Sequence, residues 1–207
     1  MRKIQDLFPT TMGFSQLDTE LCLQAGRDVL KLVDPDTILS EGGATTLDDL
    51  NQLPQFAQLI AMIDVEVKAF TNEVLGIEAD SLEMSCMWSN VYKFGQIHGK
   101  HMHPNSFLSG VVYFNVPNDG IPGAIEFFDP RPAKNMCQPN YTRVTPMSVM
   151  TQAYNPEVGM MILFPSWLEH RVNKFTTSTD DVRISASFNY NLVRSSGSTM
   201  KINKFGV

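Results

Sequence analysis

The sequence predicts an α+β fold in which two N-terminal helices pack outside a β-sandwich or jelly roll. Two observations support this prediction: apolar residues recur at helical spacing in the first third, and short alternating segments follow Ser81. A chain of 207 residues fits one domain. Within that domain, 1–207, we expect a mainly helical scaffold over 1–80, a jelly-roll core over 81–193 and a tail over 194–207.

The helices are expected at two places in the first third of the chain. Leu17 to Val33 has apolar residues near helical spacing and ends before Pro35, which cannot continue a helix. Gln55 to Leu75 is the stronger candidate, because its apolar residues fall at positions three, four and seven apart. Between them we expect a loop over Ser40 to Thr46, with a threonine at its end capping a short helix.

Short strands with turn residues between them are expected in the second part of the chain. They are Met87 to Phe94, Ser106 to Val116, Ala124 to Phe128, Gly159 to Pro165, Trp167 to Asn173 and Val182 to Val193. The last alternates cleanly, with Arg183, Ser185, Ser187, Asn189 and Asn191 on one face and apolar residues on the other. On this pattern alone, Arg183 is expected to be exposed and to form a salt bridge.

Composition limits the classes of function. A formal net charge of −6 and a pI of about 5.1 argue against a protein that coats nucleic acid or an anionic membrane. The three cysteines, Cys22, Cys86 and Cys137, are far apart and form no CxxC pair, so no disulfide framework or zinc ribbon is predicted. No apolar run is long enough for a signal peptide or a membrane span. We therefore expect a soluble protein in the reducing cytoplasm.

The four histidines of the chain form the strongest candidate site. His98, His101 and His103 lie within six positions, and His170 follows an apolar segment expected to be a strand. If the HMH segment is extended, His101 and His103 point to the same face, roughly 7 Å apart, and can bind one metal ion together with His170. The alternative is that these histidines are ordinary residues of surface loops and bind no metal. The role of His98 stays open between a neighbour of the site, a substrate contact and a replacement ligand.

The C-terminal half resembles the Fe(II)/2-oxoglutarate-dependent oxygenases. The resemblance runs from about Trp88 to Asn191 and rests on the segments HMHPNSFLSGVVYF, FFDPR, GMMILFPSWLEHRV and RISASFN. It is strongest to a group of 2OG-Fe(II) oxygenases with an HxH…H variant of the metal motif. It implies a double-stranded β-helix, which is a cupin-like jelly roll, with Fe(II) bound by His101, His103 and His170. It also implies 2-oxoglutarate as co-substrate.

The same resemblance implies residues that bind 2-oxoglutarate. Arg183 and Ser185 match the RxS pattern that holds the distal carboxylate in the family, and a guanidinium suits a carboxylate because it donates two parallel hydrogen bonds. Tyr113 and Asn115 stand in a YFN segment that resembles the YLN strand of the prolyl-hydroxylase-like branch. From the residues alone, Tyr113 is equally suited to binding 2-oxoglutarate and to filling the core. The choice between a functional and a structural role is equally open for Asn115.

One departure from the family pattern concerns charge. His103 stands where the family has Asp or Glu, and neutral imidazoles leave the charge of Fe(II) uncompensated. Dianionic 2-oxoglutarate can supply that compensation, although three histidines also suit zinc. Glu126, Asp129 and Glu169 are the carboxylates considered for a normal triad, but Glu169 is expected to point away because it adjoins His170 on a strand.

The expected function is that of an Fe(II)- and 2-oxoglutarate-dependent oxygenase, a hydroxylase, that uses O₂ and a substrate the sequence does not identify. No catalytic side chain is expected beyond the metal ligands. Two alternatives stay open: a three-histidine metalloenzyme that does not use 2-oxoglutarate, and a non-catalytic jelly-roll binding or structural protein. The RxS pattern argues against the first and the intact polar residues against the second, whereas the missing carboxylate favours the second. The oligomeric state does not follow from the sequence.

Overall fold

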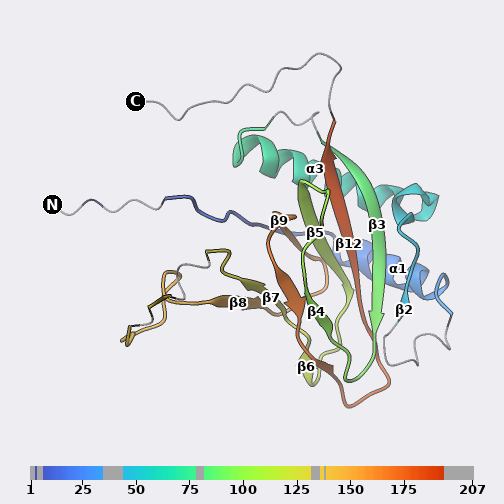
Figure 1. Ribbon diagram of the computed structural model, residues 1–207. Helices are drawn as coiled ribbons and strands as arrows, with labels where there is room; N and C mark the ends of the chain where they lie inside the picture. Colours follow the sequence, from blue (N-terminus) through green and yellow to red (C-terminus); the bar gives the residue numbers. More distant parts are fainter. Residues whose placement is uncertain are drawn as a thin grey trace.

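The computed structural model describes residues 3, 7–34, 44–77, 82–131, 136–137 and 139–193 (Figure 1). Two antiparallel sheets face each other in a jelly roll. In spatial order, the larger sheet consists of β1 (Gly13–Gln16), β9 (Met160–Pro165), β5 (Leu108–Asn115), β12 (Arg183–Leu192), β3 (Leu82–Tyr92) and β2 (Ala44–Thr45). The smaller consists of β4 (His98–His101), β10 (His170–Val172), β7 (Ile125–Phe128) and β8 (Thr151–Tyr154). A two-stranded ribbon pairs β6 (Ile121–Pro122) with β11 (Phe175–Thr176).

The helices cover the outer face of the larger sheet, as predicted (Figure 1). The first, α1 (Thr19–Leu30), begins after Asp18, whose carboxylate accepts a hydrogen bond from the Leu21 N–H at 2.7 Å. The second, α3 (Ala57–Glu73), follows the single 3₁₀ turns η1 (Leu50–Gln52) and η2 (Pro54–Phe56). No helix in the described part of the chain is both long and apolar enough to cross a membrane.

Strand alternation divides the interior into two apolar clusters. On β5, Val112 and Phe114 pack under the helices, whereas Val111 and Tyr113 point between the two sheets. On β12, the apolar residues also face the helices: Ile184, Ala186, Phe188 and Tyr190. The polar face of β12 therefore points into the jelly roll and not to solvent.

The structure corrects several predictions for individual elements. The helix expected after Thr46 is wrong: Ala44 and Thr45 form β2, and the Thr46 hydroxyl accepts a hydrogen bond from the Ser89 N–H at 2.9 Å. Pairing with β3 thus replaces helix capping. Of Trp167 to Asn173, only β10 is a strand. Six strands were not predicted because they are too short for a clear alternation: β1, β2, β4, β6, β8 and β11.

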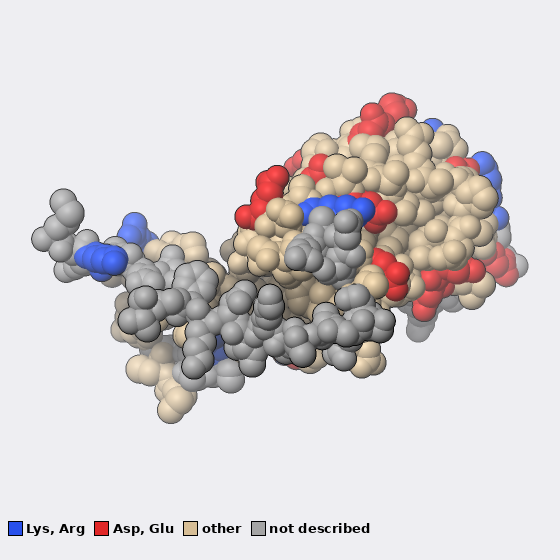
Figure 2. All heavy atoms as spheres, turned by 90° about the horizontal axis from the view of Figure 1, so that it is seen from above, with Lys and Arg blue, Asp and Glu red and all other residues tan. Residues whose placement is uncertain are grey.

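Part of the expected domain organisation is not described. The tail, 194–207, lies outside the described residues, as does the segment 40–43 of the expected loop. The division into a scaffold over 1–80 and a core over 81–193 stays a prediction. On the face seen in Figure 2, acidic side chains cover more of the surface than basic ones, in keeping with the net charge of −6.

We predict that the centre of the larger sheet tolerates no side chain at Gly110. A Cβ there would lie 2.3 Å from Cζ of Phe188, which is opposite in the strand register, and 2.9 Å from Cδ2 of Leu163. Both neighbours are buried, so Gly110→Ala should lower the free energy of unfolding by about 1–3 kcal/mol in urea denaturation. Gly99→Ala is the control, because a Cβ at Gly99 meets no atom within 4 Å and should change stability by less than about 0.5 kcal/mol. Equal effects of the two substitutions would contradict the packing argument.

Candidate metal and co-substrate site

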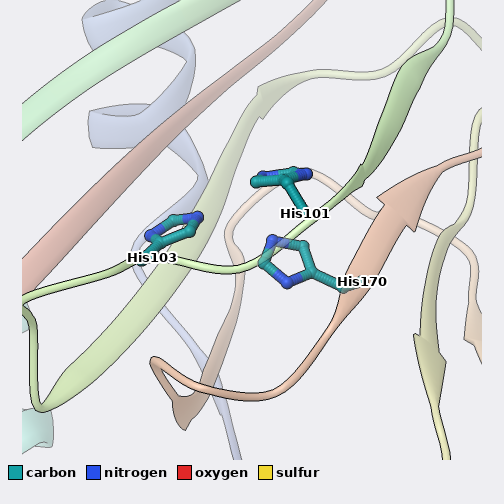
Figure 3. A group of neighbouring side chains, drawn as sticks. All are labelled: His101, His103 and His170. Carbon is teal, nitrogen blue, oxygen red and sulfur yellow. The ribbon is translucent and has the colours of Figure 1, made fainter.

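Neighbouring strands of the smaller sheet place the three histidines of the candidate site. His101 ends β4 and His170 begins β10, and the two are direct partners in the strand register. His103 lies two residues beyond β4, where its N–H donates to the Ser166 carbonyl at 2.9 Å. One ring nitrogen from each histidine lies within 4.8 Å of the others. Figure 3 shows the three rings around a common space. The structure thus brings His101, His103 and His170 together.

Hydrogen bonds determine which nitrogen of each ring is available. Nδ1 of His101 lies 2.8 Å from the Gly99 carbonyl oxygen, and Nδ1 of His170 lies 2.9 Å from that of Leu168. Nδ1 of His103 lies 2.6 Å from Oδ1 of Asn189. These oxygens only accept hydrogen bonds, so each Nδ1 carries a proton, and in the neutral form of each ring Nε2 keeps its lone pair. The three histidines thus have the tautomer that a metal ion requires of an Nε2 ligand.

Burial keeps two of these rings neutral. The pKa of His170 is lowered to about 3, mainly by burial and also by the neighbouring histidines, and the hydrogen bond that its ring donates to the Leu168 carbonyl acts in the opposite direction. Burial also lowers the pKa of His103, in this case against its bond to Asn189. The two side chains are 4% and 9% exposed. Neutral imidazole is the form that binds metals, so His103 and His170 are in the binding form at neutral pH.

Arg183 lies inside the jelly roll, as its assigned role on the resemblance requires and contrary to the exposed position that its strand pattern alone suggests. It is 1% exposed, and no hydrogen-bond partner in the described part of the chain reaches its Nε or Nη1. Its guanidinium lies 5.4 Å from the ring centre of Tyr92 and 5.0 Å from that of Tyr113. The Tyr113 hydroxyl is also buried without a partner among the described residues. Burial raises the pKa of Tyr113 against the charge of Arg183, so the hydroxyl keeps its proton.

One cavity connects the histidines to Arg183. Its volume is about 40 Å³, and its lining includes all three histidines, Tyr113, Arg183 and Ser185. Ser185 lies opposite Tyr113 in the register of β12 and β5, two residues from Arg183 on the same face. The described lining contains no carboxylate. Unpartnered cationic and phenolic donors beside three neutral nitrogens fit a metal ion and an anionic ligand.

Asn115 is not brought to this cavity. Its amide donates hydrogen bonds to the Val182 carbonyl at 2.6 Å and to Asp181 at 3.2 Å, at the far end of β5. It therefore joins the start of β12 to β5 and does not line the site. His98 does line the cavity, with Nδ1 2.8 Å from the Tyr92 hydroxyl and its ring 4.3 Å from that of His101.

The carboxylates considered for a normal triad lie outside the cavity and pair with cations. Glu126 lies 2.6 Å from Arg171, and Glu169 lies 2.6 Å from Lys100. Asp129 accepts from Arg131 at 2.8 Å. None of the three lines the cavity of the histidines, so His103 is not replaced by a neighbouring acid.

Sequence reasoning missed part of the cavity wall. Trp88, Asn90 and Tyr92 alternate along β3 and line the cavity. Tyr92 matters most, since it stacks on Arg183 and also contacts His98. The alternation within MWSNVY indicated a shared face, but only the pairing of β3 with β12 shows that this face is internal.

We predict that three of the four histidines are needed for metal binding. Replacing His101, His103 or His170 by Ala should weaken Co(II) or Fe(II) binding roughly a hundredfold, because each removes one Nε2 ligand. Anaerobic calorimetry measures this. His98→Ala is the control and should bind the metal like the wild type. If His98→Ala loses the metal and one of the other variants keeps it, the ligand set is wrong.

The comparisons with known proteins agree with this arrangement. A sequence model of the family described as "Putative 2OG-Fe(II) oxygenase" matches residues 86–189, which is half of the chain. No curated protein matches the chain. Among solved structures, a prolyl-4-hydroxylase from Pseudomonas putida has a TM-score of 0.61 at 16% identity, covering 89% of this chain and 94% of its own.

Two further structures share the fold. HygX from Streptomyces hygroscopicus, solved with nickel and 2-oxoglutarate, has a TM-score of 0.58 at 13% identity, covering 88% of this chain and 82% of its own. The viral collagen prolyl hydroxylase of Paramecium bursaria Chlorella virus-1, solved with 2-oxoglutarate, has a TM-score of 0.57 at 13% identity, covering 88% and 96%. The likeness confirms the double-stranded β-helix. With the family match over its core, this chain belongs to the 2OG-Fe(II) oxygenases, enzymes that use Fe(II) and 2-oxoglutarate.

Proposed function

We propose that His101, His103 and His170 bind the catalytic Fe(II), and that Arg183 binds the distal carboxylate of 2-oxoglutarate. Ser185 and the Tyr113 hydroxyl complete the carboxylate site. The observation that carries this proposal is a buried guanidinium that has no counter-charge among the described residues, in the cavity that the histidines line. Such a charge is costly unless a ligand neutralises it.

The donors around Arg183 suit one end of a dicarboxylate. Nε and Nη1 of Arg183 have no partner among the described residues, and the guanidinium can donate two parallel hydrogen bonds to the two oxygens of a carboxylate, from Nε and Nη2 or from Nη1 and Nη2. The Tyr113 hydroxyl keeps its proton and can donate a third hydrogen bond. The rings of Tyr92 and Tyr113 fix the guanidinium and exclude water from it.

The metal end of the site supplies the redox chemistry. Bound Fe(II) with 2-oxoglutarate and O₂ supports the oxidative decarboxylation to succinate and CO₂ that is coupled to hydroxylation of a C–H bond. The protein orients three Nε2 atoms through hydrogen bonds at Nδ1 and holds the carboxylate donors in a buried wall. We infer a hydroxylase whose partners are O₂ and a substrate still to be identified.

The neutral histidine triad changes the charge balance of the site. With no carboxylate in the described lining, Fe(II) and Arg183 contribute three positive charges, and 2-oxoglutarate contributes two negative ones. Each partner should therefore increase the affinity of the other, because their binding free energies are linked.

The cysteines support our inference of a reducing cytoplasm, since Cys22, Cys86 and Cys137 are free.

We predict that Arg183→Ala removes binding of 2-oxoglutarate and leaves metal binding nearly intact. Loss of a buried charge-assisted pair costs about 2–5 kcal/mol, or roughly thirtyfold to several thousandfold in Kd. Calorimetry on the Co(II)-loaded protein measures the affinity. Arg171→Ala is the control, because that exposed arginine pairs with Glu126 outside the cavity and should leave the Kd unchanged. Unchanged binding by a folded Arg183→Ala variant would contradict the assignment.

We also predict that His103→Asp weakens the coupling between metal and 2-oxoglutarate. A carboxylate at this position neutralises one charge of the metal before the co-substrate binds. The ratio of the metal Kd measured without 2-oxoglutarate to the metal Kd measured with it should fall by at least about tenfold. That change corresponds to a loss of about 1.4 kcal/mol of coupling free energy. Both Kd values come from the same anaerobic titrations. A ratio equal to that of the wild type would show that charge balance does not link the two ligands.

A further inference from the structure

A buried cluster of neutral polar side chains lies behind His103. It consists of Ser109 on β5, Ser166 after β9 and Asn189 on β12, and both serines are fully buried. The Ser109 hydroxyl donates to Oδ1 of Asn189 at 2.7 Å, lies 2.7 Å from the Ser166 hydroxyl, and lies 3.1 Å from Nδ1 of His103. Asn189 Oδ1 lies 2.6 Å from the same Nδ1. Side chains from two strands, β5 and β12, thus meet at one ring nitrogen, and Ser166 contacts the Ser109 hydroxyl.

His103 differs from the other two histidines in how its ring is held. Nδ1 of His101 and of His170 bonds a backbone carbonyl, which no substitution of a side chain removes. Nδ1 of His103 instead depends on side chains. A serine hydroxyl both donates and accepts, so it does not determine the tautomer of the ring. The amide oxygen of Asn189 only accepts, and it is therefore the group that determines it.

The orientation of the Asn189 amide is itself fixed on both sides. Oδ1 accepts from Ser109, and Nδ2 donates to Sγ of Cys86 at 3.4 Å. Asn189 is 8% exposed and lies on the inward face of β12, six residues from Arg183. An amide held at both ends presents its oxygen to His103 before any metal binds.

We propose that Asn189, oriented by Ser109, is a positioning residue for His103: it holds the N–H on Nδ1 and so directs Nε2 to the metal. This inference rests on the proposed metal site. It also accounts for a histidine at the position where the family pattern has an acid, since an imidazole needs an acceptor behind it and β12 supplies one. The cluster contains no charged group, so Asn189 fixes the ring without adding a negative charge.

The test compares Asn189→Leu, which has a similar shape and no acceptor, with Asn189→Asp, which keeps one. Co(II) binding is followed anaerobically by its visible absorption. Asn189→Leu should weaken Co(II) binding about 10- to 100-fold, as expected for loss of the acceptor behind a ligand histidine. Asn189→Asp should restore the Kd to within a few-fold of the wild type. Asn191→Leu, further along the same strand, is the matched control and should bind Co(II) normally.

A second readout separates positioning from a role in folding. In the metal-free protein, ¹⁵N NMR of the imidazoles should show His103 protonated at Nδ1 in the wild type and in Asn189→Asp, and a mixture of tautomers in Asn189→Leu. If Asn189→Leu does not fold, Asn189→Ala, which is smaller and also lacks the acceptor, takes its place and should shift the tautomer in the same direction. A variant without the acceptor that keeps both the tautomer and the Co(II) affinity overturns the inference. Co(II) binding that is insensitive to His170→Ala would instead overturn the metal site itself.

Discussion

The burial of Arg183 with no negatively charged partner in the described part of the chain is the constraint on which the interior of this molecule depends. Removing a charge from water costs several kcal/mol even in a relaxed protein. The rings of Tyr92 and Tyr113 offset part of that cost, because a cation over an aromatic face contributes about 0.5–2 kcal/mol. The remainder must come from packing elsewhere or from a ligand. This buried cation beside the three histidines is the basis of our proposal that the cavity binds an anion.

The layered fold makes this arrangement possible. The helices α1 and α3 bury the apolar face of the larger sheet, and this helix–sheet cluster contains most of the buried apolar side chains. The space between the sheets holds a smaller apolar cluster around Ile162 and Phe164. Stability is therefore concentrated outside the jelly roll, and the inner wall is free to be polar. This is why one strand, β12, carries both a continuous apolar face and the site residue Arg183.

Much of the site could be predicted from the sequence, and the rest could not for physical reasons. The spacing of His101 and His103 indicated one ligand pair, and alternation on β12 placed Ser185 with Arg183. Alternation does not show which face of a strand is covered, so the pattern alone expected an exposed Arg183. The pairing of His101 with His170 joins residues far apart in the chain, which spacing cannot show. The position of Asn115 outside the cavity could not be predicted for a similar reason, because its hydrogen-bond partners Asp181 and Val182 come from the segment just before β12.

The most direct measurement of the central claim is an anaerobic titration of the Fe(II)-loaded wild-type protein with 2-oxoglutarate. Chelation of Fe(II) by the 2-oxo acid produces a weak visible charge-transfer band, so one signal reports the metal, the co-substrate and their shared cavity. The account predicts a band that saturates at one equivalent of 2-oxoglutarate per iron. A protein that binds Fe(II) at the three histidines but shows neither the band nor any retained 2-oxoglutarate would contradict it.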